Sequence, residues 1–205
     1  MEAGFDILLL SPEQDIAYEA EILNRLFNLG LTSFHLRNPK WSLEQVEQIL
    51  NNVPAEFHNR IVLHSHFELT DKFELKGIHL NEANKKLISQ FVQYPIISAS
   101  FHSVDDIKEN TFPYQYIFLG PIFNSISKAG YKSTFELSVV ADELALMKKK
   151  NPSLPKVIAL GGINSDNISK VKSAGFSGAA ILGAVWQSSD PLKALAEIRS
   201  KIDAK

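Results

Sequence analysis

Short apolar segments alternate along the whole chain with longer segments whose apolar residues recur at helical spacing. The apolar segments are four or five residues long, which is typical of strands buried on both faces of a parallel sheet. The eight predicted strands are Asp6–Leu10, Ser33–Leu36, Ile61–His64, Gly77–Leu80, Ile96–Ser100, Tyr116–Leu119, Lys156–Leu160 and Gly178–Leu182.

The segments between these strands carry the start and stop signals of helices. Ile16–Leu29 has helical periodicity and is followed by Gly30, a common residue at a helix C-terminus. Ser42 precedes the next periodic segment and Gln45 follows three residues later, which is the pattern of a capping box. The predicted helices are Ile16–Leu29, Ser42–Leu50, Phe135–Lys149, Ser165–Ala174 and Pro191–Ile202, the last with Asp190 as its N-cap.

Eight strand–helix units in 205 residues average about 26 residues each, close to the ~30 of a βαβ unit. Strict alternation implies a parallel sheet with right-handed crossovers, and eight repeats favour a closed barrel. We therefore expect residues 1–205 to form a single α/β domain, a (β/α)₈ TIM barrel. An open, doubly wound sheet is the alternative, but the turn Leu10-Ser11-Pro12-Glu13 lacks the glycines expected after its first strand.

Composition excludes several classes of partner. The chain has 21 Lys+Arg against 23 Asp+Glu, a net charge of −2, whereas a nucleic-acid or anionic-membrane partner normally requires a basic excess or stripe. The only basic run, Lys148 to Lys150, is predicted to be the solvated end of a helix. Small molecules are therefore the expected partners, and the sequence leaves the choice between a monomer and a homo-oligomer open.

The chain contains no cysteine, which excludes disulfides, thiolate metal sites and a cysteine nucleophile. No segment approaches the roughly 20 apolar residues of a transmembrane helix, and the first apolar run is too short for a signal peptide. These features favour the cytoplasm as the location.

Polar residues gather where the predicted strands end and the next loops begin. In a TIM barrel this end carries the chemistry, so residues far apart in the sequence are expected to converge on one mouth. Four of the six histidines are there. The mouth positions are His35, Arg37, His64, His66, Asn81, Ser100 and His102.

Two glycine turns follow the last two predicted strands. Gly161-Gly162 comes after the seventh strand and Leu182-Gly183 after the eighth, each before a predicted helix. Glycine lets backbone N–H groups approach an anion closely, and helix N-termini add partial positive charge. Because these two loops form the usual phosphate site of the fold, we predict phosphate binding here. The alternative is that the glycines only form tight turns.

The loop after the sixth strand, residues 120–130, is too long and polar to be a simple connection. Ser125, Ser127 and Lys128 are predicted to close over an anionic substrate and exclude water. The alternative is a flexible surface loop.

The mouth histidines allow two interpretations. Arg37 offers a planar fork suited to phosphate oxygens. By strand alternation His64 and His66 share a side, and with His35 they would supply the three ligands of a catalytic zinc site. The positive charge of Arg37 beside such a metal favours the other interpretation, in which the histidines contact substrate or each other. Outside this group, His79 is predicted to face the barrel or a helix, and His58 to be exposed.

Taken in order, these strand ends resemble the thiamine phosphate synthase/TenI superfamily over nearly the whole chain. The most specific matches are Gly120-Pro121-Ile122-Phe123 and Gly161-Gly162-Ile163. Further matches are His35-Leu36-Arg37 and the segments 77–80, 98–103, 125–128 and 180–184.

The resemblance implies a transferase that joins a pyrimidine methyl pyrophosphate to a thiazole phosphate and releases pyrophosphate. It implies that Arg37, Ser100 and Lys128 act at the pyrophosphate as the catalytic residues. The resemblance and the polar residues at the mouth together predict a set of substrate-binding residues. These are His35, His64, His66, His102, Ser125, Ser127, Gly161, Gly162, Leu182 and Gly183.

The resemblance also implies a Mg²⁺ ion held by two aspartates, one after the third strand and one after the fourth. In this chain His64-Ser65 and Asn84 stand at those places. Since Mg²⁺ prefers carboxylate and phosphate oxygens, we expect a weakened site, to which Glu82 and Asn84 are the candidate ligands. A lysine expected two residues after the arginine is replaced by Pro39.

The TenI branch of the superfamily isomerises a thiazole carboxylate phosphate by proton transfer. Its catalytic histidine lies in the loop after the sixth strand, where this chain has Pro121, so His102 or His64 would have to move the proton. The leading hypothesis is thus a synthase-like transferase. A TenI-like isomerase, a non-catalytic barrel that binds thiamine-pathway phosphates and a histidine-ligated metal hydrolase are the alternatives.

Overall fold

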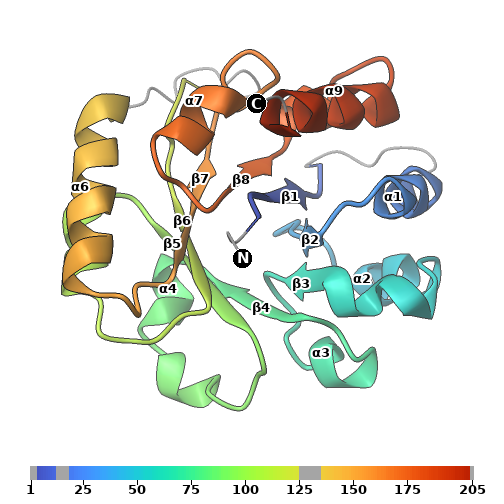
Figure 1. Cartoon of the computed structure of the whole chain (residues 1–205). Helices are drawn as coiled ribbons and strands as arrows, with labels where there is room; N and C mark the ends of the chain where they lie inside the picture. The colour runs from blue at the N-terminus through green and yellow to red at the C-terminus, as the bar shows by residue number, and fades with distance from the viewer. Residues whose placement is uncertain (1–3, 13–18, 125–134, 204–205) are drawn as a thin grey trace.

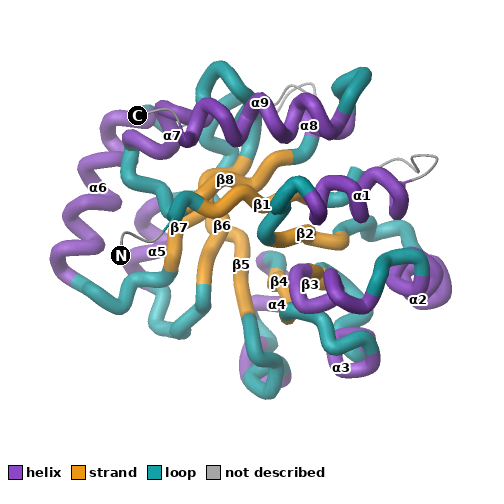
Figure 2. The backbone as a smooth tube through the Cα atoms, turned by 45° about the vertical axis from the view of Figure 1, so that its right-hand side comes forward, coloured by secondary structure: helices purple, strands orange, loops and turns teal. Residues whose placement is uncertain are grey.

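The structure, a computed structural model, describes residues 4–12, 19–124 and 135–203. Its strands are β1 (Asp6–Leu10), β2 (Ser33–Leu36), β3 (Ile61–Leu63), β4 (Gly77–Leu80), β5 (Ile97–Phe101), β6 (Tyr116–Leu119), β7 (Lys156–Leu160) and β8 (Gly178–Ile181). These strands are parallel and pair in chain order, and β8 pairs with β1 to close the barrel. Figure 2 shows the strands in the centre with helices around them. The predicted TIM barrel is confirmed.

Helices cover the outside of the barrel (Figure 1). They are α1 (Glu19–Asn28), α2 (Leu43–Asn51), α3 (Leu69–Lys72), α4 (Glu82–Lys85), α5 (Val104–Glu109), α6 (Leu137–Lys150), α7 (Ile168–Ser173), α8 (Gly183–Trp186) and α9 (Pro191–Asp203), with the 3₁₀ helices η1 (Ala55–Arg60) and η2 (Ile88–Gln90). None of the helices in the described residues is long and apolar enough to cross a membrane.

The predicted helix caps are present. Ser42 accepts a hydrogen bond from the backbone N–H of Gln45, whose side chain accepts one from the backbone of Ser42. Asp190 accepts hydrogen bonds from the backbone N–H groups of Leu192 and Lys193 at 3.1 and 3.0 Å. These side chains satisfy N–H groups that a helix leaves without partners in its first turn.

Several predicted boundaries differ from the structure by one to three residues, and the following are examples. β3 ends at Leu63, so His64 already belongs to the loop. β5 is shifted by one residue, because Phe101 still pairs with Leu119 of β6. The helix predicted from Ser165 begins only at Ile168. The preceding residues form a turn in which the Asn167 side chain accepts the N–H of Asn164 at 3.0 Å, an asparagine turn that competes with helix.

The barrel interior has an apolar side and a polar side. Strand residues alternate between the interior and the helix-facing surface. Outward residues such as Leu9 and Ile78 belong to the large core between strands and helices, while a small apolar cluster inside joins β1, β6, β7 and β8. On the other side, β2, β4 and β5 carry the buried polar residues His35, His79 and Ser98. The sequence therefore places polar chemistry inside one half of the barrel.

Replacing Leu9 by alanine tests the outer core. Leu9 has no exposed surface, so Leu9→Ala is expected to lower the free energy of unfolding by about 2–5 kcal/mol. The matched control is Val139→Ala, because Val139 is 54% exposed and should change stability by no more than about 0.5 kcal/mol. Urea unfolding followed by circular dichroism gives both values. Equal losses in the two variants would contradict this assignment of the core.

Candidate functional site

A cavity of about 490 Å³ lies at the carboxyl ends of the strands. The predicted convergence of distant residues on this mouth is seen directly in its lining. The predicted mouth residues on its wall are Arg37, His64, Asn81, Ser100, His102, Gly161, Gly162, Leu182 and Gly183.

The two glycine turns face this one cavity. Gly161 and Gly162 have φ angles of +100° and +65°, a region in which glycine is strongly favoured. A Cβ added at Gly162 would come within 2.8 Å of the Phe123 Cβ, so the loop after β6 packs directly on this turn. The prediction that both turns open helices is only half right. α8 begins at Gly183 and is a single turn, whereas α7 begins five residues after Ile163.

Hydrogen bonds hold the loops after β6 and β7 together. The backbone N–H groups of Ile122 and Phe123 donate to the carbonyl oxygens of Leu160 and Gly161 at 2.8 and 3.1 Å. The Asn167 side chain donates to the Gly162 carbonyl oxygen at 2.9 Å. An anion bound against these turns would therefore meet backbone that is already ordered, which reduces the entropy lost on binding.

Arg37 lies between this cavity and a neighbouring one. The second cavity has a volume of about 700 Å³ and shares Arg37, His64 and Asn81 with the first. The Ser11 hydroxyl accepts from the backbone N–H of Arg37 at 2.7 Å and donates to its carbonyl oxygen at 2.8 Å. The backbone that carries the guanidinium is thus fixed at the border, where the side chain can serve ligands in either cavity.

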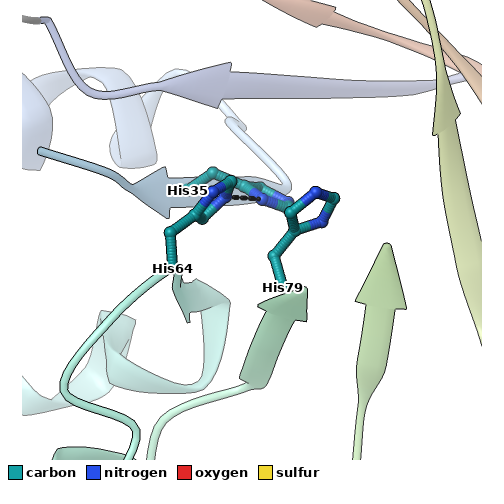
Figure 3. Close-up of side chains that lie close together, drawn as sticks. All are labelled: His35, His64 and His79. Atoms are coloured by element: carbon teal, nitrogen blue, oxygen red, sulfur yellow. Dashed lines mark hydrogen bonds between the residues drawn. The ribbon is translucent and has the colours of Figure 1, made fainter. Parts of the chain in front are cut away.

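Three histidine rings from β2, β4 and the end of β3 meet below the mouth (Figure 3). Hydrogen bonds of 2.9 Å join His35 Nδ1 to His64 Nε2 and His35 Nε2 to the Tyr116 hydroxyl. His79 is hydrogen-bonded through Nδ1 to the Ser98 hydroxyl and through Nε2 to the Ser100 hydroxyl, both at 2.8 Å. His64, His79 and Ser100 line the cavity, so this network forms part of its floor.

These three imidazoles are neutral at neutral pH. Burial lowers the pKa of His35 and of His64 well below its ordinary value, and the neighbouring His79 ring adds to both shifts. Burial, with Arg37 and Lys85 as smaller causes, lowers the pKa of His79 to about 3. Neutral rings retain lone pairs that can accept hydrogen bonds, accept protons or bind a metal.

The structure changes the predicted grouping of the histidines. His66 does not join the cluster, because β3 has already ended and His66 has a φ of +52°, so strand alternation no longer applies. Its Nε2 lies 3.0 Å from the Trp41 carbonyl oxygen and it lines only the second cavity. His35 has no exposed surface and does not line the cavity, but it is hydrogen-bonded to His64, which does. His58, predicted to be exposed, is half-buried, with ring nitrogens close to backbone carbonyl oxygens.

His79, predicted to face the barrel or a helix, lines the bottom of the cavity. Strand alternation in the sequence already indicated that it faces the barrel interior. Ile78 and Leu80 are large, apolar and fully buried in the outer core, which directs His79 inward. Ser98 and Tyr116 were not recognised as site residues from the sequence, because they lie deeper in the barrel than the loops that usually carry functional residues.

The donors at the mouth do not fit Mg²⁺. Of the described residues that line the two cavities, only Glu68 and Glu82 carry carboxylates. The Glu82 carboxylate forms an ion pair of 2.5 Å with the Lys85 ammonium group, and Asn84 offers an amide. Mg²⁺ requires an octahedral set of oxygens, normally including free carboxylates. The predicted weakening of the magnesium site agrees with this donor set. Ser125, Ser127 and Lys128 lie outside the described residues.

Comparison with known proteins decides the family. The family described as "Thiamine monophosphate synthase" matches residues 7–185. The chain belongs to this family.

Relatives of this family member cover nearly all of its length. It is 27% identical to the thiamine-phosphate synthase of Leuconostoc citreum, with 92% of each chain covered, and 26% identical to that of Oceanobacillus iheyensis, with 85% and 87% covered. Among solved structures, thiamine phosphate pyrophosphorylase from Bacteroides thetaiotaomicron is 30% identical, with 97% and 98% covered and a TM-score of 0.76. The Pyrococcus furiosus enzyme, 18% identical, shares the fold with a TM-score of 0.78 and 97% and 96% covered.

Gly162→Ala tests how the glycine turn is built. Alanine would adopt a left-handed backbone conformation, which costs about 1–2 kcal/mol, and its Cβ would also collide with the loop at Phe123. Gly175→Ala is the control, since Gly175 has a φ of +83° but no atom within 4 Å of the added Cβ. Gly162→Ala should therefore lose clearly more free energy of unfolding than Gly175→Ala. Equal losses in urea unfolding would contradict the close approach of the two loops.

Acid should destabilise this protein through the buried histidines. Below a pH of about 6.5 the unfolded chain binds protons that the folded chain, with its lowered histidine pKa values, does not bind. The free energy of unfolding should therefore fall as the pH falls, by up to about 1.4 kcal/mol per pH unit for each histidine. Urea unfolding between pH 7.5 and 5 measures how steeply the free energy of unfolding changes with pH. His79→Asn should reduce this pH dependence by the contribution of one histidine. An unchanged slope in this variant would contradict a neutral His79.

Proposed function

We propose that this family member is a thiamine phosphate synthase-like transferase. It would join a hydroxymethylpyrimidine pyrophosphate to a thiazole phosphate and release pyrophosphate. The observation that carries the proposal is that Arg37 and the two glycine turns line one cavity in a chain of this family. One end of the cavity suits a phosphate group, and Arg37 at its border suits the pyrophosphate.

The reaction mainly requires stabilisation of the charge on the leaving pyrophosphate and correct placement of the two substrates. The bond between the pyrimidine methylene carbon and the pyrophosphate oxygen breaks, and its electron pair leaves with the pyrophosphate. The lone pair of the thiazole nitrogen then forms the new carbon–nitrogen bond. Such chemistry is assisted by groups that stabilise the leaving anion and by close placement of the two reactants.

Arg37, Ser100 and Lys128 are the residues we assign to the leaving pyrophosphate. Arg37 supplies a fixed positive charge and two parallel N–H donors, and the Ser100 hydroxyl would supply a further donor by turning its proton from His79 Nε2 to the pyrophosphate. The backbone amides at Gly162 and Gly183 would hold the thiazole phosphate. The neutral His64 ring adds no positive charge beside the pyrimidine cation, which favours formation of that cation.

Purified full-length protein, both substrates and Mg²⁺ should give thiamine phosphate, read by fluorescence after oxidation. The family resemblance implies Mg²⁺, but Glu82 and Asn84 are the oxygen donors we can assign to it. A parallel reaction with a chelator therefore measures how far the ion is needed. Product at the level of a reaction without enzyme would exclude the transferase.

Arg37→Gln should lower kcat/KM for this reaction by about 30- to 1,000-fold. This range corresponds to the loss of about 2–4 kcal/mol of transition-state stabilisation from one charged group. Arg25→Gln is the matched control, because Arg25 is exposed on α1, away from both cavities. If both variants retained full activity, Arg37 would have no role at the pyrophosphate.

A TenI-like isomerase is the second candidate, and His102 favours it. His102 Nδ1 lies 3.1 Å from the Gly120 carbonyl oxygen. Because a carbonyl oxygen only accepts, neutral His102 carries its proton on Nδ1 and keeps a lone pair on Nε2. His102 lines the cavity next to Pro121, close to the loop in which that branch carries its histidine. Proton NMR of the thiazole carboxylate phosphate tests this activity, and calorimetry with thiamine phosphate tests a barrel that only binds.

A further inference from the structure

The buried histidine cluster has features that the proposed transferase does not require. One ring nitrogen from each of His35, His64 and His79 lies within 4.8 Å of the other two. The rings come from β2, β4 and the loop residue that directly follows β3, and they lie close together (Figure 3). At the same mouth, His64-Ser65 and Asn84 stand at places where the family resemblance implies acidic ligands of Mg²⁺. Among the described residues there, imidazole nitrogens rather than unpaired carboxylates are the grouped donors, which favours a different class of cation.

The hydrogen-bond network assigns a lone pair to His79. The Ile78 carbonyl oxygen can only accept, so the Ser98 hydroxyl, 3.2 Å away, donates to it. Ser98 must then accept from His79 Nδ1, 2.8 Å away, which leaves His79 Nε2 without a proton. On the other ring, His35 Nε2 lies 2.9 Å from the Tyr116 hydroxyl, whose oxygen can accept a hydrogen bond from it. With its proton on Nε2, His35 has a lone pair on Nδ1.

This pattern matches the outer shell of a histidine metal site. A metal-binding histidine usually donates its second ring N–H to a fixed acceptor, which orients the ring and sets its tautomer. The Ser98 hydroxyl provides that acceptor for His79, and the Tyr116 hydroxyl can provide it for His35. The other ring nitrogens, His35 Nδ1 and His79 Nε2, are hydrogen-bonded to His64 Nε2 and to the Ser100 hydroxyl in this structure.

We propose that His35, His64 and His79 bind one Zn²⁺ ion, with an open coordination position facing the cavity. Three neutral imidazoles are a suitable set for Zn²⁺, and a catalytic zinc site normally has three protein ligands and one open position. His64 and His79 line the cavity, so the open position would receive an oxygen atom of water or of a phosphorylated ligand.

Metal binding requires the three rings to shift. Tetrahedral Zn–N bonds of ~2.0–2.1 Å place ligand nitrogens roughly 3.3 Å apart. His35 Nδ1 and His64 Nε2, now 2.9 Å apart, would separate by a few tenths of an ångström. The His79 nitrogen, which lies within 4.8 Å of the other two, would approach them, and His64 would bind through Nε2 with its proton on Nδ1.

The charges around the cluster modulate the proposed site. Arg37 is close enough to lower the pKa of His64 and His79, so it also repels a bound cation. Lys85 contributes less, because its ammonium group is paired with Glu82. Removing the charge in Arg37→Gln should therefore tighten Zn²⁺ binding about tenfold, as expected for ~1–2 kcal/mol of repulsion across a partly solvated distance.

The test measures metal binding directly and needs no enzymatic activity. Full-length protein is stripped with a chelator and titrated with Co²⁺, a spectroscopic substitute for Zn²⁺ that gives visible absorption bands when tetrahedral. Zn²⁺ content after dialysis is measured by mass spectrometry. We expect one ion per chain, at least a 100-fold weaker affinity in His64→Gln and in His79→Asn, and a tighter affinity in Arg37→Gln.

His66→Gln is the matched control, because it removes a nearby histidine that lies outside the cluster. It should bind Zn²⁺ like the unchanged chain. The proposal is overturned if the unchanged chain takes up less than about a tenth of an equivalent, or if His66→Gln loses the ion while His79→Asn keeps it. Circular dichroism of each variant separates loss of a ligand from loss of the fold. Since the metal content does not depend on turnover, an inactive protein that binds Zn²⁺ would refute only the transferase.

Discussion

Closure of eight short parallel strands is the constraint on which the rest of the structure depends. Each strand has only three to five residues, and none could be stable without a neighbour on both sides. When β8 pairs with β1, every strand end is brought to a common rim. Residues 29 positions apart, such as His35 and His64, then lie within hydrogen-bond distance. The site is therefore a direct product of barrel closure.

The divided interior explains how this barrel tolerates buried polar groups. Most of the described inward positions of β1, β7 and β8 are apolar, whereas histidine and serine side chains come from β2, β4 and β5. A buried polar group without a partner is costly, but here each ring nitrogen of His35 and His79 has one. Burial also keeps these rings neutral, and this suits both the floor of the proposed phosphate-binding cavity and the proposed metal site.

Family membership bears on the substrates of this chain, whereas the side chains particular to this chain bear on the cation that it can bind. The glycine turns and Arg37 belong to the pattern shared with the family, and they support binding of phosphorylated ligands. The histidine cluster shares one position, His64, with the magnesium site that the resemblance implies, and its donors are nitrogen rather than oxygen. The proposed Zn²⁺ site thus depends on the side chains of His35, His64 and His79 rather than on the fold.

Local patterns in the sequence determined the alternation of strands and helices, the caps at Ser42 and Asp190, and the gathering of polar residues at strand ends. These features depend on neighbours a few residues away, so they can be derived without coordinates. Which histidines meet was decided only by the tertiary structure. His66 is turned away because β3 stops at Leu63. Strand alternation already indicates that His79 points inward, but its meeting with His35 and His64 depends on how β2, β3 and β4 pair. Contacts between strands depend on register and closure, and no local pattern carries that information.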